Sequence, residues 1–310
     1  MLETCHYFLA YFGIIFISVC TLSFLKKLLW GIKLYVLPKF IKQDLKKYGE
    51  WAVVTGGSSG IGKHTAIELA KSGLKLILIG NELEQLQSTT EDIKAEFDVE
   101  CSYVFADLTA GKEVCDYIWS KIEDKDIGIF INCAGVCGNI PCYFLDETEE
   151  NTLKLIALNM DIIVNTTYRL INLYSKKKNG VIINVSSSAS AFPVSYMAVY
   201  SSCKRFMHLF TKAVNIELTD TGVLLQSLTP CSVNTRNVIN RPYLKKFGIV
   251  TSCEKFCKSW IMSIGKTDSY TGYWLHKIQH YFSQMCPAFL YNFISKKFFI
   301  ESEKYKNINK

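Results

Sequence analysis

The stretch Trp51-Ala-Val-Val-Thr-Gly-Gly-Ser-Ser-Gly-Ile-Gly62 decides the fold class. Its first five residues are apolar or β-branched, as in a strand that is buried on both faces of a parallel sheet. A glycine-rich turn follows, and residues 63–72 then show a helical pattern that Gly73 ends. Glycines 56, 60 and 62 permit a tight turn and close approach of the backbone to a phosphate, and a helix N-terminus offers free amides to an anion. The stretch predicts a dinucleotide-binding turn, and a purely structural glycine turn is the alternative.

Strand-like and helical patterns alternate along the chain after this stretch. Apolar strand patterns lie at residues 51–55, 75–79, 102–105, 127–132, 181–185 and 223–228. This alternation predicts an α/β fold with a doubly wound parallel sheet that is covered on both faces. A chain of 310 residues is long enough for one such domain with additions. We expect a membrane anchor and connector at 1–47, the catalytic domain at 48–275 and an aromatic helical extension with a polar tail at 276–310.

A second stretch, from Gly180 to Lys204, carries the candidate chemistry. It reads as a strand, a serine-rich loop and, after Pro193, a helix on which Tyr200 and Lys204 share one face. An ammonium group one turn away favours the phenolate of a tyrosine, whose pKa is ordinarily near 10. Ser187 at the strand end can hydrogen-bond a carbonyl or alcohol oxygen while Tyr200 gives or takes a proton. Together these residues predict carbonyl reduction or its reverse, although each alone also fits an ordinary loop or helix.

Three further motifs accompany these two stretches. They are Ala-Asp107-Leu, Asn132-Cys-Ala-Gly135 and Leu-Asn159-Met. In order and spacing, the five motifs resemble those of the short-chain dehydrogenase/reductase family, and the resemblance covers residues 48–272. The family's Asn-Asn-Ala-Gly element has Cys133 in place of its second asparagine here. The resemblance implies a Rossmann-type fold and an oxidoreductase that acts on CH-OH groups with NAD(P).

The resemblance also assigns roles to individual residues. Ser187 and Tyr200 hold the substrate oxygen, Tyr200 supplies the proton, Lys204 lowers the pKa of the tyrosine, and Asn159 holds a proton-relay water. By the same resemblance, the following residues are expected to bind the dinucleotide: Thr55, Gly56, Ser58, Ser59, Gly60, Ile61, Gly62, Asn81, Asp107, Asn132, Ala134, Gly135, Tyr200, Lys204, Pro230, Val233 and Thr235.

Within the family, the chain is most similar to a membrane-anchored group. This group includes very-long-chain 3-oxoacyl-CoA reductases, 17β-hydroxysteroid dehydrogenases and hydroxysteroid dehydrogenase-like proteins. The resemblance rests on an apolar segment before the nucleotide fold, on residues 47–56 and on Tyr270-Thr-Gly-Tyr-Trp274 with its aromatic tail. It implies reduction of a ketone on a long-chain 3-oxoacyl-CoA or a 17-ketosteroid. A retinol or hydroxysteroid dehydrogenase is an alternative. An inactive scaffold is another, because some hydroxysteroid dehydrogenase-like proteins have lost the catalytic tyrosine, which this chain keeps.

The choice of cofactor depends on the residues after the second strand. An acidic residue there binds the ribose diol of NAD, whereas a basic residue accommodates the 2′-phosphate of NADP. Here the sequence is Gly80-Asn81-Glu82, and relatives in the membrane group usually have arginine at the position of Asn81. The resemblance implies NADP(H), with NAD(H) as an alternative. A further departure is Cys231, where many family members have glycine.

The N-terminal segment predicts a membrane anchor. Residues 7–25 carry no charge and would form a helix of about 28 Å, just enough to span a bilayer. A cleaved signal peptide is less well supported, because Glu3 and no basic residue precede the segment. The lysines that follow place the catalytic domain in the cytosol, and we expect the endoplasmic reticulum membrane, with the mitochondrion as the alternative. Residues 28–47 read as a juxtamembrane connector or an ordinary linking helix.

The composition excludes several classes of site and partner. The net charge of +7 is spread along the chain, which disfavours nucleic-acid binding, and twelve cysteines without regular spacing predict reduced thiols and no metal site. A hydrophobic fraction of 49% favours membrane contact. The expected partners are a lipophilic small molecule and a membrane, and a homodimer stays open.

Two late segments are assigned to the substrate side. Residues 236–258 lack a firm period and stand where the family has its substrate loop, so we expect them to set specificity. Residues 273–299 are rich in aromatic side chains and poor in acidic ones. They fit a membrane-dipping helix pair, a lid over an apolar substrate or a packed C-terminal helix.

Overall fold

The computed structural model describes residues 2–41, 43–138, 140–235, 250–287 and 289–297. The chain divides into two compact units, Met1–Gln43 and Asp44–Lys310. The first unit consists mainly of α1 (Leu2–Tyr35), followed by a short 3₁₀ turn at Leu37–Lys39. Within α1, the part His6–Tyr35 is long and apolar enough to cross a membrane. The helix covers the predicted anchor at 7–25 and continues into the first part of the predicted connector.

The second unit is built on one parallel sheet of seven strands in the order β3-β2-β1-β4-β5-β6-β7. The first six strands match the predicted ones, with ends that differ by one residue at most, while β7 was not predicted. Their bounds are β1 Trp51–Thr55, β2 Lys75–Gly80, β3 Cys101–Phe105, β4 Ile127–Asn132, β5 Gly180–Val185, β6 Val223–Leu228 and β7 Ser269–Tyr270. This strand order is that of a Rossmann-type sheet, so the predicted fold class is confirmed.

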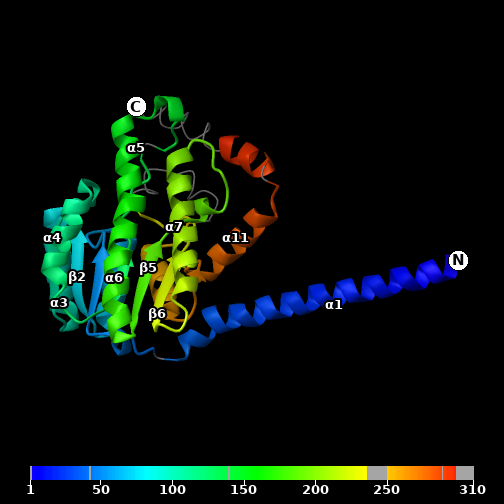
Figure 1. Ribbon diagram of the computed structural model, residues 1–310, viewed down its shortest axis with the longest axis horizontal. Coiled ribbons are helices and arrows are strands. Elements are labelled where there is room, and N and C mark those ends of the chain that lie inside the picture. Colours follow the sequence, from blue (N-terminus) through cyan, green and yellow to red (C-terminus); the bar gives the residue numbers. More distant parts are fainter. Residues whose placement is uncertain (1, 42, 139, 236–249, 288, 298–310) are drawn as a thin grey trace. The chain divides into compact units, whose positions relative to one another are not determined.

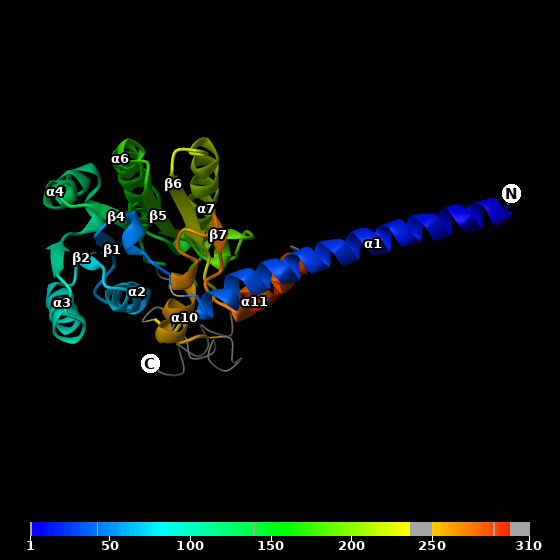
Figure 2. The same ribbon diagram turned by 90° about the horizontal axis from the view of Figure 1, so that it is seen from below.

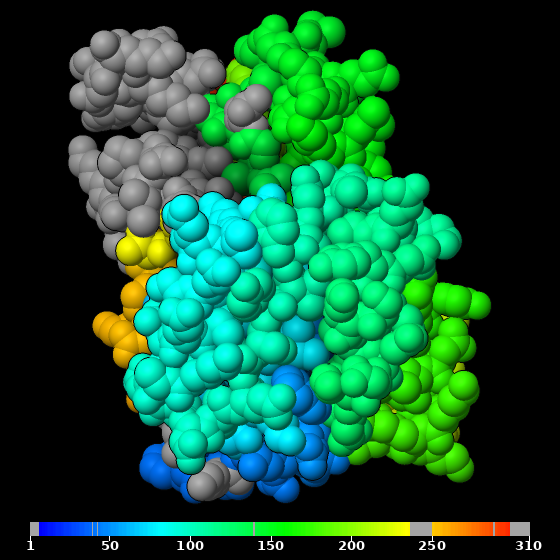
Figure 3. All heavy atoms as spheres, turned by 90° about the vertical axis from the view of Figure 1, so that its left-hand side faces the viewer, coloured from blue at the N-terminus to red at the C-terminus, as the bar shows by residue number. Residues whose placement is uncertain are grey.

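The position of a strand in the sheet explains its sequence. Every residue of β1, β4 and β5 is buried, because helices cover both faces of these central strands. The edge strand β3 instead buries Cys101 and Val104 and exposes Tyr103 and Phe105. Figure 3 views the molecule from this side, where cyan residues of α3 and β3 form a continuous surface.

Helices form a layer on each side of the sheet (Figures 1 and 2). One layer holds α4 (Lys112–Ile122), α6 (Ile162–Lys177) and α7 (Ala198–Glu217), and the other holds α2 (Gly60–Lys71), α3 (Leu83–Phe97) and α10 (Cys253–Trp260). In the first layer, Ile118, Leu170 and Met207 pack in one buried cluster with Phe130 of β4. The sheet thus has an apolar core that fixes the ends of its strands.

The helix α10 corrects part of the predicted substrate loop. Residues 236–249 lie outside the described residues, but residues 253–258, also expected to be irregular, belong to α10. The Ser252 hydroxyl caps this helix by accepting a 3.3 Å hydrogen bond from the Lys255 amide. Its buried side chains follow a helical spacing. The expectation of a loop was wrong here because a helix of eight residues contains too few turns for its period to be detected in the sequence.

Two more helical regions complete the substrate side. The helix α5 (Glu149–Ile156) runs through a π-helical turn, Ala157–Asp161, directly into α6. After β7, α11 (Trp274–Met285) and a helical segment at 289–297 make up the described part of the predicted aromatic extension.

Candidate active site

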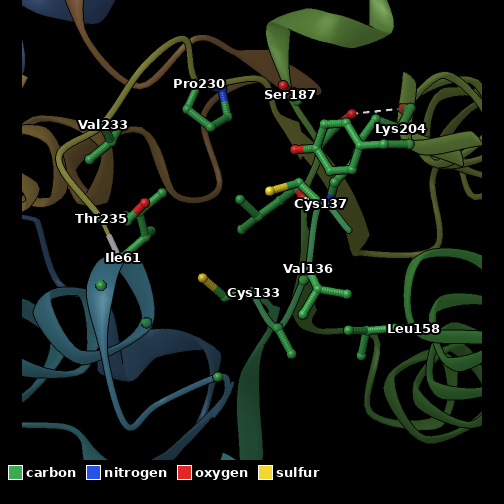
Figure 4. Close-up of a pocket in the computed structure, with 18 of the residues that line it drawn as sticks. Ile61, Cys133, Val136, Cys137, Leu158, Ser187, Lys204, Pro230, Val233 and Thr235 are labelled. Carbon is green, nitrogen blue, oxygen red and sulfur yellow. Dashed lines mark hydrogen bonds between the residues drawn. The ribbon is translucent and has the colours of Figure 1, made fainter. Parts of the chain in front are cut away.

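A pocket of about 620 Å³ lies at the carboxyl ends of the strands. Its wall comes from the segments that follow β1, β2, β3, β4, β5 and β6, from the start of α2 and from α7. Figure 4 shows the part formed by α2, by the segments after β4, β5 and β6, and by α7. Parallel doubly wound sheets bind their ligands at this edge, because the strand order reverses there and leaves a crevice between the loops.

Most of the predicted site residues meet in this pocket. Those that line it are Gly56, Ser58, Ser59, Gly60, Ile61, Gly62, Asn81, Asp107, Ala134, Gly135, Ser187, Tyr200, Lys204, Pro230, Val233 and Thr235. Thr55, Asn132 and Asn159 are buried behind the lining. The pocket thus brings together side chains from both halves of the sheet.

The side chains with candidate chemistry come from the end of β5 and the start of α7. Lys204 is only 4% exposed, and its Nζ donates a 2.8 Å hydrogen bond to the Val185 carbonyl. The Lys204 carbonyl in turn accepts a 2.8 Å hydrogen bond from the Ser186 hydroxyl. The Lys204 Nζ lies 5.8 Å from the centre of the Tyr200 ring. Strand and helix are thus tied together where Ser187, Tyr200 and Lys204 face the pocket.

The electrostatic environment of Lys204 suits a group that stays cationic near neutral pH. Burial lowers the pKa of this lysine from 10.5 to about 8, because the ammonium loses its water. At pH 7 most of the population still carries the positive charge. The same burial raises the pKa of Cys133 to about 12, so this neighbouring thiol stays protonated and neutral. Lys204 thus supplies the positive charge beside Tyr200.

Asn159 is positioned by the π-helical turn between α5 and α6. The extra residue in such a turn re-aims the side chains around it. The Asn159 Nδ2 donates a 2.9 Å hydrogen bond to the Leu155 carbonyl, while its buried Oδ1 has no hydrogen-bond partner among the residues that the structure describes. A Cβ placed on Gly135 would lie 3.6 Å from this oxygen and 3.4 Å from the Lys204 Nζ. The two polar groups thus converge on the backbone of Gly135.

The glycine-rich turn fits a dinucleotide by its shape. A Cβ on Gly62 would lie 2.0 Å from the Gly56 carbonyl oxygen, so no side chain fits there. Gly56 itself has φ +67° and passes close to Ala134. The side chain of Ser59, at the N-cap of α2, makes no capping hydrogen bond. The first amides of α2 therefore face the pocket without a side-chain cap, which is the arrangement that binds a pyrophosphate.

Three predicted cofactor residues have structural contacts of their own. The Thr55 hydroxyl accepts 2.9 Å hydrogen bonds from the amides of Cys133 and Ala134, and so joins β1 to the loop after β4. The Asn132 Nδ2 donates a 2.8 Å hydrogen bond to Asn184 of β5. The Asp107 carboxylate accepts hydrogen bonds from the Thr109 amide and hydroxyl and caps a 3₁₀ turn. Thr55 and Asn132 therefore support the pocket wall from behind.

Cys133 and Cys231, two residues that differ from the family pattern, have different surroundings in the structure. The side chain of Cys133 points into the pocket (Figure 4). The amide of Cys231 donates a 3.4 Å hydrogen bond to Nδ1 of the fully buried His276 in α11. Cys231 thus links the exit of β6 to the C-terminal extension, in place of the glycine found in many family members.

Several lining residues were missed by the sequence analysis. Glu82 lines the pocket beside Asn81, and its carboxylate accepts a 3.5 Å hydrogen bond from the Ser58 hydroxyl. Tyr291 and Ser295 reach the wall from the helical segment at 289–297. Ser186 could have been singled out from the serine run after β5, but no local pattern marks Tyr291 and Ser295, because only tertiary packing brings them to the pocket.

Comparison with known proteins identifies the family. A family model for short chain dehydrogenases matches residues 50–243. The chain belongs to the short-chain dehydrogenase family. The predicted family and enzyme class are thereby confirmed, and the family acts on hydroxyl and keto groups.

Relatives within the short-chain dehydrogenase family include both a reductase and a protein called inactive. The chain is 35% identical over 248 residues to very-long-chain 3-oxoacyl-CoA reductase of Rattus norvegicus, covering 79% of this chain and 78% of the relative. It is 33% identical over 263 residues to inactive hydroxysteroid dehydrogenase-like protein 1 of Homo sapiens, covering 84% and 80%. A solved short-chain dehydrogenase from Sphingobium yanoikuyae in complex with NADPH has the same fold, with a TM-score of 0.64 at 24% identity over 69% of this chain and 83% of that one.

Proposed function

We propose that the chain is a membrane-bound oxidoreductase that uses a nicotinamide dinucleotide to reduce a ketone on a lipophilic substrate. The observation that carries this proposal is the meeting of Ser187, Tyr200 and Lys204 on one wall of the pocket, with Asn159 behind them. The short-chain dehydrogenase family supplies the reaction class. Long-chain 3-oxoacyl-CoA and 17-ketosteroids are the proposed substrates.

The side chains divide the work around the substrate oxygen. The dinucleotide supplies the hydride when it is bound. The hydroxyls of Ser187 and Tyr200 donate hydrogen bonds to the ketone oxygen, and Tyr200 gives this oxygen its proton as negative charge develops there. The ammonium of Lys204 stabilises the phenolate that is left. The Asn159 Oδ1, which has no partner in the part of the chain that the structure describes, and the Lys204 Nζ are placed to hold a water that returns a proton to this pair.

Part of the pocket lining supports an apolar substrate. Val136, Leu158, Val194, Met197 and Tyr291 all contribute to the pocket wall. Apolar walls with few polar groups at one point are typical of sites that orient a lipophilic molecule by its single reactive oxygen. The similarity to very-long-chain 3-oxoacyl-CoA reductase supports an acyl ketone in particular.

The charges at the adenosine end support NAD(H) rather than the NADP(H) that the resemblance implies. Among the described residues that line the pocket, Lys204 is the only lysine or arginine, and it lies at the other end. The carboxylate of Glu82 stands after β2, held by Ser58 of the glycine-rich turn. An acidic side chain at this point hydrogen-bonds the ribose diol and repels a 2′-phosphate. We therefore propose that NAD(H) binds at least as tightly as NADP(H).

Two other functions remain as alternatives with different consequences. An inactive scaffold is suggested by the human relative, which is called inactive. Against it stands the complete set of Asn159, Ser187, Tyr200 and Lys204. A retinol or hydroxysteroid dehydrogenase would use the same residues in the direction of oxidation. We also propose that the protein lies in the endoplasmic reticulum membrane with its catalytic domain in the cytosol. The apolar helix His6–Tyr35 supports the membrane anchor in this proposal.

The test is turnover with a panel of ketones. Full-length protein in detergent is given NADH or NADPH with long-chain 3-oxoacyl-CoA, steroid and retinoid ketones, and the loss of nicotinamide absorbance is followed. We expect Tyr200→Phe to lower kcat by about 10² or more, because it removes only the proton donor. Cofactor binding and the unfolding temperature should stay near those of the wild type.

The outcomes separate the alternatives. If wild-type protein binds dinucleotide but reduces no ketone of the panel, and oxidises none of the corresponding alcohols when it is given NAD⁺ or NADP⁺, the scaffold function is correct. If Tyr200→Phe turns over as fast as the wild type, the proposed roles in proton transfer are wrong.

A further inference from the structure

The C-terminal extension has two different faces. On the inner face of α11, His276 is fully buried, with its ring centre 5.4 Å from that of Phe256 in α10. In the helical segment at 289–297, Tyr291 and Ser295 line the pocket, and the Tyr291 ring centre lies 4.9 Å from that of Phe192. Figure 1 draws these two helical regions in orange and red. The extension is thus packed onto the catalytic unit and forms part of the wall of its pocket.

The outer face of the same extension is apolar and exposed. In α11 four exposed apolar residues follow a helical spacing of four, four and three residues, with the exposed Tyr281 beside them. The next helical segment continues the row with two more at a spacing of four, with the exposed Leu290 and Ile294 beside them. The row consists of Trp274, Ile278, Phe282, Met285, Phe289 and Phe293. Phe282 and Phe293 are each 66% exposed. Soluble surfaces rarely expose a contiguous row of this kind unless a partner or a membrane covers it.

The charged residues of this segment indicate what kind of partner covers the apolar face. Residues 274–297 contain no aspartate or glutamate, and their charged residues are Lys277, Lys296 and Lys297. Lysines beside an apolar aromatic row are typical of helices that lie in the headgroup region of an anionic bilayer. A two-fold contact with a second copy would instead bring these lysines into one self-complementary interface without a carboxylate from the same segment. The composition therefore favours lipid over a second copy.

We propose that the outer face of residues 274–297 lies in the interfacial layer of an anionic phospholipid membrane, and that lipophilic substrate enters the pocket from the membrane past Tyr291. The second half rests on the proposed function, whereas the first half stands on the surface alone. The candidate membrane helix His6–Tyr35 gives the chain a bilayer within reach. Insertion of such a face to a depth of about 5–10 Å would bring acyl chains beside the helix that lines the pocket.

The experiment measures lipid contact directly in the full chain. The photoreactive residue p-benzoylphenylalanine replaces Phe282 or Phe293, and the protein is reconstituted into vesicles of phosphatidylcholine and phosphatidylserine. After illumination we expect a mass increase of one phospholipid on the peptide that carries the probe. The matched control puts the probe at Tyr168, which is 71% exposed on α6, and should give no lipid adduct.

A second pair of variants tests the route of the substrate. Phe282→Glu and Phe293→Glu place a charge in the apolar row without touching the pocket lining. They should raise the KM for a ketone dissolved in the vesicles by about tenfold or more, because each carboxylate opposes insertion. Their kcat and KM for a short, water-soluble ketone should equal those of the wild type.

Each outcome bears on one half of the proposal. Covalent dimers instead of lipid adducts at Phe282 and Phe293, or equal lipid adducts at Tyr168, would overturn the membrane surface. Lipid adducts together with an unchanged KM for the membrane-dissolved ketone would overturn the entry route. If the wild type reduces no ketone at all, the proposed function fails, while the lipid adducts still report on the membrane surface.

Discussion

At the scale of single residues, the candidate chemistry depends on how deeply Lys204 is buried. Its side chain reaches through the wall from α7 to the carbonyl of Val185, and this burial brings its pKa down to about 8. A charge that titrates so close to neutrality makes catalysis sensitive to pH in a range that is easily measured. Neither the depth of burial nor the hydrogen bond to β5 follows from the spacing of Tyr200 and Lys204 alone.

The first prediction concerns this pH dependence. Below about pH 8, Lys204 is cationic and favours the phenolate of Tyr200, so kcat/KM for ketone reduction should be high there and fall as pH rises through this value. Lys204→Met should lower kcat by about 10². The remaining activity should decline only at higher pH, because a tyrosine without the cation returns toward its ordinary pKa near 10. A profile of Lys204→Met that declines at the same pH as the wild type would show that another group titrates.

A second prediction concerns the ribose end of the pocket. Asn81→Arg adds a charge-assisted hydrogen bond to a 2′-phosphate and should raise the ratio of NADPH to NADH affinity by about tenfold or more. Glu82→Gln should raise the same ratio by removing a negative charge beside Ser58. Dissociation constants from fluorescence titration measure both effects. Glu84→Gln, in the first turn of α3, is the matched control and should leave the ratio unchanged.

If neither Asn81→Arg nor Glu82→Gln changes the ratio, the ribose does not bind after β2. A wild-type ratio that strongly favours NADPH would contradict the proposed acceptance of NAD(H), and would mean that a group other than these two side chains selects the phosphate.

At the scale of elements, a short irregular segment positions a site residue more directly than the long helices do. The π-helical turn Ala157–Asp161 aims Asn159 at the backbone of Gly135. A regular helix through these residues would turn the side chain away, since each residue is rotated by about 100°. The motif around Asn159 predicts that this residue belongs to the site, but no pattern in the sequence predicts the inserted residue of the π turn.

The N-terminal helix α1 carries a prediction of its own. Protein made with membranes should remain in the pellet after extraction with alkaline carbonate, because the apolar helix His6–Tyr35 would have to leave the bilayer. Deletion of residues 1–25 should release a larger fraction, measured by immunoblot of pellet and supernatant. Release of the full-length protein by carbonate would contradict a spanning anchor. If the shortened protein instead stays in the pellet and is released only when Phe282→Glu or Phe293→Glu is added, that result would indicate a second membrane contact through residues 274–297.

At the scale of the whole molecule, the sequence predicts the sheet well because buried parallel strands have a simple signature. The fully buried strands β1, β4 and β5 are short apolar runs between turn residues, and their ends were predicted to within one residue. The two-residue strand β7 and the helix α10 escaped prediction because neither is long enough to show a period. The motifs predict the lining from Gly56 to Thr235.

The rest of the pocket wall depends on contacts that no local pattern encodes. Tyr291 and Ser295 come more than eighty residues after Tyr200, and tertiary packing alone brings them to the lining. The same is true of the contact between Cys231 and His276. Aromatic content marked the C-terminal segment as unusual, whereas its division into an inner and an outer face needed the burial of each side chain.

The strand order has a consequence for biosynthesis. Strand β1 pairs on one side with β2, where Trp51 lies opposite Lys75, and on the other side with β4, where Trp51 lies opposite Ile127. Roughly 50 residues separate the start of β2 from the start of β4, so at about 5–20 residues per second the second partner leaves the ribosome several seconds after the first. During this interval one edge of the apolar strand Trp51–Thr55 has no partner. The unpaired edge of β1 can therefore pair with foreign strands until β4 has been made, and we expect the nascent chain to need chaperone protection most in this interval.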